Sequence, residues 1–291
     1  MFEGVLPAII TPFKKSPSAE LDIEGLRYNV ESILGSGIHG IVPCGSTGES
    51  ATLTFEEHEQ VIGEVIDAVN GKVPVVAGTG SNNTAEAIRL TREAKNLGAD
   101  GVLVISPYYN KPNESGLIKH YTGLADLDIP VIIYNIPGRT GQNLSPDLIA
   151  KLAEHPGIAG VKEASGSINQ VSEIIEKTRD FDFTVIAGDD NMTYPMMALG
   201  GGGVISVTAN IEPELMVRLY DHMKAGEFDR ALDLHYRISP LIRALFIDTN
   251  PIPIKAAMEI RGKAAGPMRL PLDALSREKT DLLRRVLLAY D

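Results

Sequence analysis

Short apolar segments recur at even intervals from the start of the chain to about residue 207. Most are continuous runs of aliphatic residues rather than alternating ones, which is typical of strands covered on both faces of a sheet. We expect eight strands, at Val5–Ile10, Gly40–Cys44, Val73–Ala77, Gly101–Ile105, Val131–Asn135, Ala159–Glu163, Phe183–Ala187 and Gly203–Val207. A helical segment fills nearly every gap between them. The pattern therefore predicts an α/β fold, a (β/α)8 TIM barrel of parallel strands.

Capping residues mark where several helices begin. Asp22 is an expected N-cap before an amphipathic segment. Thr54 and Glu57 have the spacing of a capping box, in which each side chain caps the backbone of the other residue. Ser145 is an expected N-cap followed by Pro146 at the first helical position. These signals predict helices that begin just after each cap.

The pattern changes after the last expected strand. No convincing strand follows, and four helical segments are expected at Glu212–Ala225, Phe228–Phe246, Pro253–Arg261 and Ser276–Tyr290. One of them completes the barrel and the others form a small appendage. We therefore expect two domains, a barrel with the catalytic site at residues 1–226 and a C-terminal helical domain at residues 227–291.

Composition narrows the classes of function. The chain has 291 residues, of which 44 % are hydrophobic, enough for a large core. A net charge of −11 argues against a nucleic-acid or anionic-membrane surface, so we expect neither partner. The single cysteine, Cys44, excludes an internal disulfide and indicates a reducing, cytoplasmic location. The N-terminal segment has the pattern of neither a targeting segment nor a membrane span.

In a barrel of this kind the active site lies at the carboxyl ends of the strands. After the second expected strand, Ser46 and Thr47 offer two hydroxyls and adjacent N–H groups between glycines, which suits a carboxylate. An ordinary tight turn has the same composition. After the fourth, Tyr108 and Tyr109 lie in a loop bounded by prolines. Tyrosines there are either proton carriers or part of a subunit interface.

Lys162 is the most unusual residue, because it lies within an apolar strand. A desolvated amine loses its proton more easily, and the neutral amine attacks carbonyls to form Schiff bases. The alternative is a structural lysine that reaches solvent or pairs with Glu163. Alternation places Tyr134 on the adjacent strand facing the same way, and Gly160 is expected to leave room beside the pair. Arg139 follows at the same rim of the expected barrel, where its planar guanidinium group suits a carboxylate.

This set of residues, without a His/Cys metal cluster, indicates imine chemistry. The lysine forms an imine with a 2-oxo acid, and the iminium acts as an electron sink. A proton then leaves the neighbouring methyl group, and the resulting enamine attacks an aldehyde. We expect neither a metal nor a cofactor.

Six motifs occur in the order and spacing of a known family: GSTGE, PYYN, YNIPGRTG, GVKEASG, GDD and GVISVTAN. Together with NPIPIK at Asn250–Lys255 they resemble the dihydrodipicolinate synthase branch of the pyruvate-dependent, Schiff-base class I aldolases, over essentially the whole chain. The resemblance implies a TIM barrel with a C-terminal helical domain. It also implies condensation of pyruvate with L-aspartate 4-semialdehyde, the first committed step of lysine and diaminopimelate biosynthesis.

The resemblance assigns roles to individual residues. Lys162 is implied to form the imine, and Tyr134 to donate and accept protons, with Thr47 and Tyr109 as relay partners. The implied substrate-binding residues are Ser46, Thr47, Arg139, Gly188 and Ile205, with Arg139 on the carboxylate of the aldehyde. A homotetramer, a dimer of dimers, is implied, in which Tyr109 crosses the dimer contact to complete the neighbour's relay.

One departure affects the substrate. The synthase branch often has threonine where this chain has Ser46, whose hydroxyl preserves the relay chemistry. A Ser–Thr pair also occurs in sialic acid lyases, so the alternative is a related pyruvate-dependent aldolase such as N-acetylneuraminate lyase or 2-keto-3-deoxygluconate aldolase. Arg139 in the GRTG loop favours the synthase.

The resemblance also implies a site for the end product lysine. The residues that match it are Ser50, Ala51, His58, Asn82, Glu86 and Tyr108. Phe55 stands where regulated bacterial relatives often have a second histidine, which leaves feedback inhibition open.

The sequence is less compatible with two other classes of function. Four glycines at 200–203 are also found near the last strand of phosphate- or flavin-binding barrels, but here they lie before and at the start of the last expected strand, away from the active-site rim. A non-catalytic pyruvate sensor would keep Lys162 and the Ser–Thr pair but would need neither Tyr134 nor Tyr109. Both tyrosines are present, which favours an enzyme.

Overall fold

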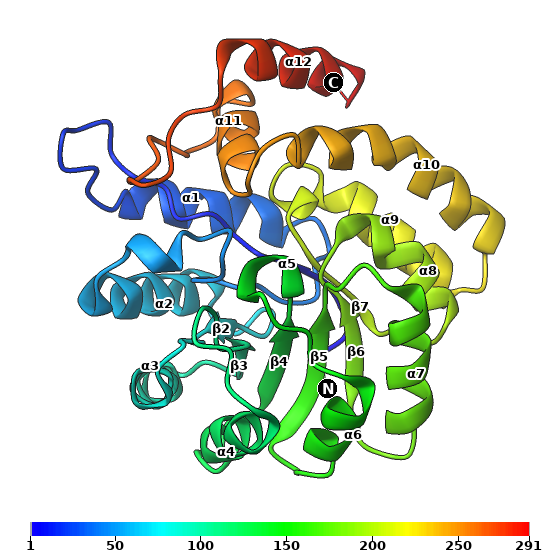
Figure 1. Ribbon diagram of the computed structural model, residues 1–291. Helices are drawn as coiled ribbons and strands as arrows, with labels where there is room; N and C mark the ends of the chain where they lie inside the picture. Colours follow the sequence, from blue (N-terminus) through cyan, green and yellow to red (C-terminus); the bar gives the residue numbers. More distant parts are fainter. Residues whose placement is uncertain (1, 291) are drawn as a thin grey trace.

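The computed structural model describes residues 2–290. Its central feature is one curled sheet of seven parallel strands surrounded by helices (Figure 1). The strands lie in the order β1-β7-β6-β5-β4-β3-β2. Their bounds are β1 Gly4–Pro7, β2 Val76–Gly78, β3 Gly101–Ile105, β4 Val131–Asn135, β5 Ile158–Glu163, β6 Thr184–Ala187 and β7 Gly203–Ser206. This barrel-like α/β arrangement brings the carboxyl ends of all the strands to one rim.

The expected strand at Gly40–Cys44 is not a regular strand. It makes isolated parallel bridges to both edges of the sheet, from Val42 to Ala8 on one side and from Ile41 to Val75 on the other. The segment therefore lies between β1 and β2, the two edge strands.

Prolines account for the irregular pairing of this segment. Pro7, Pro43 and Pro74 lie on the three neighbouring stretches of chain, and none has a backbone N–H to donate. Each proline therefore interrupts the ladder of hydrogen bonds. The apolar pattern located the segment correctly, whereas the prolines determine how it is hydrogen-bonded.

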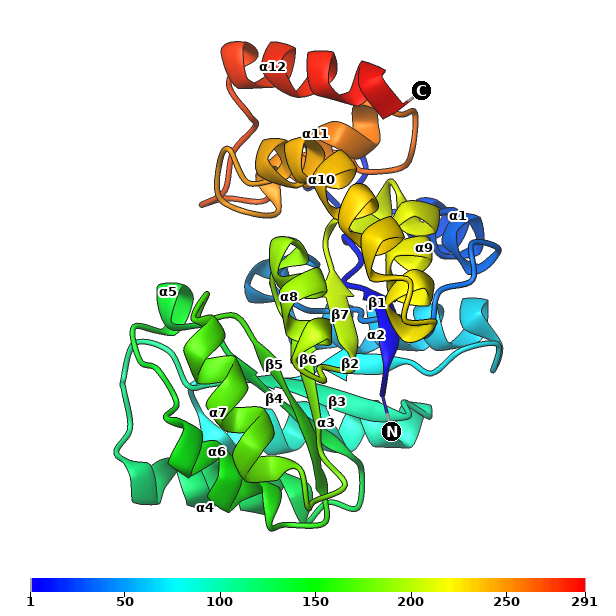
Figure 2. The same cartoon turned by 90° about the vertical axis from the view of Figure 1, so that its right-hand side faces the viewer.

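Helices cover the outer face of the sheet (Figures 1 and 2). The helices before residue 226 are α1 Ile23–Leu34, α2 Phe55–Val69, α3 Thr84–Leu97, α4 Glu114–Ala125, α5 Pro137–Thr140, α6 Pro146–Ala153, α7 Ile168–Thr178, α8 Thr193–Ala198 and α9 Pro213–Lys224. Short 3-10 turns η1 Ser50–Thr52, η2 Asp190–Met192 and η3 Thr208–Asn210 follow three strand positions. No helix between residues 2 and 290 is both long and apolar enough to cross a membrane.

The capping interactions expected at three helix starts are confirmed. The Asp22 carboxylate accepts from the Gly25 N–H at 3.0 Å. Thr54 and Glu57 form the reciprocal capping box at the start of α2. Ser145 caps the first turn of α6, with proline at its first position.

Apolar side chains fill both faces of the sheet. A large cluster lies between the strands and the surrounding helices. A smaller cluster fills the inside of the barrel, and it includes Leu6, Val42, Leu103, Ile132, Tyr134, Ile186 and Ile205. Because both faces are covered, the strands carry the continuous apolar runs seen in the sequence.

The helices after residue 226 lie beyond the carboxyl ends of the strands (Figures 1 and 2). They are α10 Phe228–Leu245, α11 Ile252–Ile260 and α12 Arg277–Leu287, followed by the turn η4 Leu288–Tyr290. A separate apolar cluster holds α10, α11 and α12 together. Ile10, Val207 and Ile211 belong to the same cluster and so attach these helices to the barrel. The expected outer ends of the two domains, residues 1 and 291, lie outside the described residues.

Candidate active site

Lys162 and Tyr134 lie side by side at the rim of the sheet. They are register partners on β5 and β4, and their side chains are almost fully buried, at 5 % and 6 % exposure. The Lys162 Nζ atom lies 4.3 Å from the centroid of the Tyr134 ring. Strand alternation therefore predicted their juxtaposition correctly.

A glycine makes room for the lysine, but it is not the expected one. A Cβ atom at Gly188 would approach the Lys162 Cγ and Cε atoms at 3.1 Å, so Gly188 leaves space for this side chain. A Cβ atom at Gly160 would instead come within 2.4 Å of the Thr184 carbonyl oxygen. Gly160 therefore allows β5 and β6 to approach closely, and the room expected from it beside the lysine comes from Gly188.

Burial affects the protonation of the two groups in opposite directions. It lowers the pKa of the Lys162 ammonium to about 7, with Asp190 opposing the shift and Arg139 adding to it. It raises the pKa of the Tyr134 phenol to about 12, with Arg139 opposing. At neutral pH a large share of Lys162 is therefore the nucleophilic amine, while Tyr134 keeps its proton.

A cavity of about 60 Å³ opens beside this pair. Six residues singled out from the sequence line it: Ser46, Thr47, Tyr134, Arg139, Lys162 and Gly188. Within residues 2–290 the backbone N–H groups of Ser46 and Thr47 donate to no protein acceptor. Both amides are therefore available to a carboxylate bound in the cavity.

Asn250 lines the same cavity and was not predicted as a site residue. Its side-chain Nδ2 donates to Thr47 Oγ1 at 3.0 Å. Its backbone oxygen accepts from Arg139 Nη2 at 2.7 Å. Asn250 belongs to the NPIPIK motif, but that motif gives no sign that the connector between α10 and α11 returns to the barrel rim.

Asp190 is a second group whose role the sequence did not indicate. Its buried Oδ2 accepts from the backbone N–H groups of Val207 and Thr208 at 3.1 and 3.0 Å, and from the Thr208 hydroxyl at 2.9 Å. It therefore ties the end of β6 to the end of β7 and supplies a negative charge near Lys162. Across residues 2–290, no group of three or more His, Cys, Asp or Glu side chains is placed to hold a metal ion.

Two predicted site residues lie outside the cavity lining. Ile205 is buried in the cluster inside the barrel, where it packs with Tyr134, and Val207 lines the cavity instead. Tyr109 is 90 % exposed and has a φ of 72°, so within one chain it projects into solvent. A single subunit therefore does not bring Tyr109 to Tyr134.

The expected lysine-site residues gather around a wider neighbouring cavity of about 480 Å³. Its lining includes Ser50, Ala51, His58, Glu86 and Tyr108, together with Phe55. Asn82 is not part of this lining, but its Nδ2 donates to the Tyr108 carbonyl oxygen at 3.2 Å. Burial lowers the pKa of His58 to about 4, so this histidine is neutral at physiological pH. Ser46, Tyr134, Arg139 and Asn250 line both cavities.

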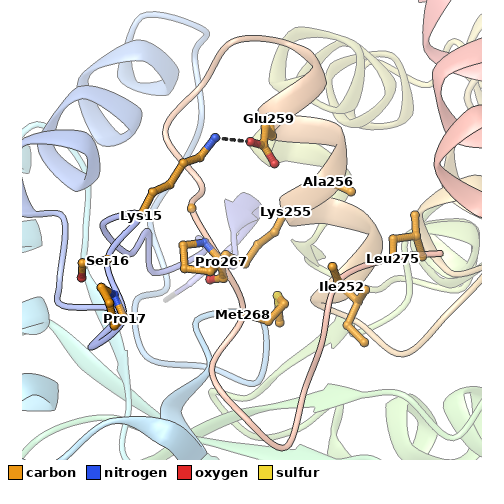
Figure 3. A pocket seen from close by; sticks show the side chains of 12 residues that line it. Lys15, Ser16, Pro17, Ile252, Lys255, Ala256, Glu259, Pro267, Met268 and Leu275 are labelled. Atoms are coloured by element: carbon orange, nitrogen blue, oxygen red, sulfur yellow. Dashed lines mark hydrogen bonds and ion pairs between the residues drawn. The ribbon is translucent and has the colours of Figure 1, made fainter. Parts of the chain in front are cut away.

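A third cavity, of about 490 Å³, lies beside a second buried lysine (Figure 3). Lys255 extends from α11 towards Pro267, whose carbonyl oxygen accepts at 2.8 Å. Its Nζ also donates to Glu49 Oε1 at 2.7 Å and to the Thr11 carbonyl oxygen at 3.2 Å. Lys255 is therefore fully engaged with protein acceptors.

Known proteins resemble this chain over its full length. The Dihydrodipicolinate synthetase family matches residues 1–290. The 4-hydroxy-tetrahydrodipicolinate synthase of Methanoculleus marisnigri is 67 % identical over 290 residues, covering 100 % of both chains. A chloride-inhibited dihydrodipicolinate synthase from Acinetobacter baumannii, complexed with pyruvate, has a TM-score of 0.96 at 41 % identity over 99 % of both chains. The synthase from Cyanidioschyzon merolae with lysine bound has a TM-score of 0.96 at 40 % identity, over 99 % of this chain and 98 % of that one. The chain therefore belongs to the dihydrodipicolinate synthetase family.

Proposed function

We infer that this chain is a lyase that condenses pyruvate with L-aspartate 4-semialdehyde through a Schiff base on Lys162. Full-length relatives carry the name of this synthase. The observation that carries the assignment of the nucleophile is the setting of Lys162. Its side chain is buried against the Tyr134 ring, and burial lowers its pKa to about 7. It also lines the cavity that the backbone amides of Ser46 and Thr47 face.

The first half of the reaction forms a carbon nucleophile. The neutral Lys162 amine attacks the keto carbon of pyruvate, and protonation of the resulting hydroxyl lets water leave. The Tyr134 phenol, protonated at neutral pH, supplies that proton. The Tyr134 phenolate left by that transfer then takes a proton from the methyl group; the C–H electron pair forms a C=C bond and the C=N π pair moves to the positive nitrogen, which gives an enamine. The Ser46 and Thr47 amides hold the pyruvate carboxylate through this sequence.

The second half forms the new carbon–carbon bond. The enamine carbon attacks the aldehyde carbon, and the aldehyde oxygen takes a proton from the relay that includes Tyr134. The amine of the semialdehyde then displaces Lys162 from the imine carbon, which closes the ring and restores the free lysine. Arg139, at the rim of the cavity, binds the carboxylate of the aldehyde substrate.

A substrate screen tests this function. The purified protein is given pyruvate with aspartate semialdehyde, N-acetylmannosamine or glyceraldehyde, and consumption of pyruvate is measured. We expect turnover with aspartate semialdehyde, and Arg139→Ala should lower it more than tenfold while pyruvate imine formation changes less. Turnover with N-acetylmannosamine or glyceraldehyde alone would assign the chain to a related aldolase.

We further propose that the wider cavity binds lysine. Five of the six residues matched to that site line one cavity, and Asn82 holds the Tyr108 loop beside it. Arg139 and Asn250 line both cavities, which gives an occupant a direct route to the active site. Titration calorimetry with L-lysine should give binding that Glu86→Ala abolishes, because that change removes the acceptor for an ammonium group. Lysine binding that persists in Glu86→Ala would place the lysine elsewhere.

The finer architecture is also a proposal. We assign residues 1–226 to a (β/α)8 barrel, with the segment Gly40–Cys44 in the place of the eighth strand, and residues 227–291 to a C-terminal helical domain. We propose a homotetramer built from dimers in which Tyr109 serves the neighbour's site, because its ring is 90 % exposed in one chain. Co-refolding of inactive Tyr109→Phe and Lys162→Ala proteins should restore about a quarter of wild-type activity, since about half of random dimers are mixed and each has one intact site. Mixed dimers without recovered activity would exclude the shared site.

A further inference from the structure

We propose that Asn250 is a positioning residue of the condensation reaction, which turns the Thr47 hydroxyl proton into the cavity beside Lys162. The proposal rests on the proposed function and adds to it a residue from outside the barrel strands. Asn250 lies at the end of the connector between α10 and α11, and only 7 % of it is exposed.

The hydrogen bond between Asn250 and Thr47 has a definite direction. Asn250 Nδ2 donates to Thr47 Oγ1 at 3.0 Å. A hydroxyl has one proton and two lone pairs, and this bond occupies one lone pair. The Thr47 hydroxyl keeps its own proton, and within residues 2–290 it donates that proton to no protein group. Because Thr47 is 3 % exposed and lines the cavity, the acceptor is the molecule bound there.

The remaining atoms of the amide agree with this orientation. Asn250 Oδ1 is buried without a partner. Turning the amide over would place Oδ1 against Thr47, draw the hydroxyl proton away from the cavity and leave the NH2 group without an acceptor. A buried N–H without an acceptor is rarer in proteins than a carbonyl with an open lone pair. The observed orientation is therefore the favourable one, and it makes Thr47 a donor to the substrate.

Asn250 holds two site residues through different groups. Its side chain serves Thr47, whereas its backbone oxygen accepts from Arg139 Nη2 at 2.7 Å. A side-chain substitution therefore removes the Thr47 contact and leaves the Arg139 contact available. This separation gives a kinetic signature: changes at Asn250 affect the step with pyruvate more than the recognition of the aldehyde.

A double-mutant cycle tests whether Asn250 acts through Thr47. We expect Asn250→Ala to lower kcat/KM for pyruvate about tenfold, the effect of one well-placed hydrogen bond, with little change in KM for the semialdehyde. Thr47→Val removes the hydroxyl at nearly constant shape. The double variant should be no worse than Thr47→Val alone, because the amide then has no hydroxyl to orient. Losses that multiply in the double variant would overturn the proposal.

A near-isosteric variant, Asn250→Asp, distinguishes a change in the orientation of the Thr47 hydroxyl from an effect on folding. Asn250→Asp places a carboxylate beside Thr47, which attracts the hydroxyl proton away from the cavity, so activity should fall. A buried carboxyl has a raised pKa, and its protonated form again donates to Thr47. The activity of Asn250→Asp relative to wild type should therefore rise as the pH is lowered from about 9 to about 6. A ratio that does not change with pH, or that falls, would contradict the proposal.

The control is Thr249→Ala, an exposed neighbour on the same connector, which should retain activity within about twofold of wild type. Imine formation with pyruvate alone is measured for every variant. If the wild type forms the imine but does not use the semialdehyde, the proposed function fails while the Asn250–Thr47 cycle is still decided on the imine step. If the wild type condenses both substrates and the cycle is additive, only the Asn250 proposal fails.

Discussion

Two lysines in this chain are almost fully buried, and they have different environments. Lys162 is 5 % exposed and Lys255 is 3 % exposed, and burial lowers the pKa of both. Lys255 donates to a carboxylate and two carbonyl oxygens, and its Nζ lies 4.4 Å from the centroid of the Phe13 ring. Lys162 lies against the Tyr134 ring, and within residues 2–290 it forms no ion pair. Burial alone therefore does not identify a nucleophile.

The partners of Lys255 explain its structural role. Glu49 follows the turn that carries Ser46 and Thr47, Thr11 follows β1, and Pro267 precedes the last helix. The second oxygen of Glu49 accepts from the Arg269 backbone N–H at 3.2 Å. Lys255 thus joins the barrel rim to the C-terminal helices as a charged group. Among the described residues, 2–290, no acceptor takes a proton from Lys162, and its burial favours the neutral form.

The largest expected difference between the two lysines is in catalysis. Lys162→Met should lower condensation on the order of 10⁴-fold or more, because the covalent nucleophile is lost. Its thermal stability should be preserved, because no ion pair is broken. Lys255→Met should keep imine formation in the folded fraction while lowering the melting temperature. If Lys255→Met abolished condensation and Lys162→Met lowered the melting temperature, the roles of the two lysines would be reversed.

The second largest expected effect is on the free energy of unfolding. Glu49→Gln leaves the Lys255 charge buried without a counterion, and the free energy of unfolding should fall by about 3–5 kcal/mol. Adding Lys255→Met to Glu49→Gln should recover part of that loss. Glu259→Gln, which breaks the exposed ion pair with Lys15 in the same region, should have almost no effect. Denaturant unfolding measures all of these, and equal effects of Glu49→Gln and Glu259→Gln would show that the buried pair is not a structural clamp.

A smaller effect is the pH dependence of imine formation. In the proposed reaction Lys162 attacks as the neutral amine, and burial lowers its pKa to about 7. The rate constant with pyruvate should be constant above that pH and fall about tenfold per unit below it, because each unit lowers the neutral fraction tenfold. Stopped-flow measurements at constant ionic strength give this profile. A midpoint near 10, the value of an ordinary lysine, would remove the distinction between the two lysines.

The smallest expected effect comes from the charges around Lys162. Arg139 adds to the lowering of the Lys162 pKa, whereas Glu49 raises that of Lys255. Arg139→Gln should therefore move the midpoint of imine formation to higher pH, by less than about one unit, since burial is the larger cause. The same pH profile with pyruvate alone measures it. A midpoint that moves to lower pH would mean that Arg139 acts on Lys162 other than by its charge.

Local patterns in the sequence predicted the parts of the site that depend on local rules. Strand alternation placed Lys162 beside Tyr134, and the capping residues placed the starts of α1, α2 and α6. The rule that parallel strands end at one rim brought Ser46, Thr47 and Arg139 to the same cavity.

Contacts between distant segments could not be predicted in this way. Asn250 reaches Thr47 across 203 positions of sequence, and no local pattern signals such a contact. The room beside Lys162 comes from Gly188, which directly follows β6, rather than from Gly160, because strand spacing and side-chain direction together decide which glycine matters. Prolines at 7, 43 and 74 made the segment at 40–44 irregular despite its apolar pattern. The proposed role of Tyr109 involves a second chain, and no local pattern in the sequence places a residue relative to another subunit.

Reductive trapping tests most directly the claim that the unpaired buried lysine is the nucleophile. The protein is treated with borohydride in the presence of pyruvate, digested, and analysed by peptide mass. We expect one pyruvate-derived adduct, on the peptide that contains Lys162, with Lys255 unmodified in the same digest and no adduct in Lys162→Ala. An adduct on Lys255, or an adduct that persists in Lys162→Ala, would contradict it.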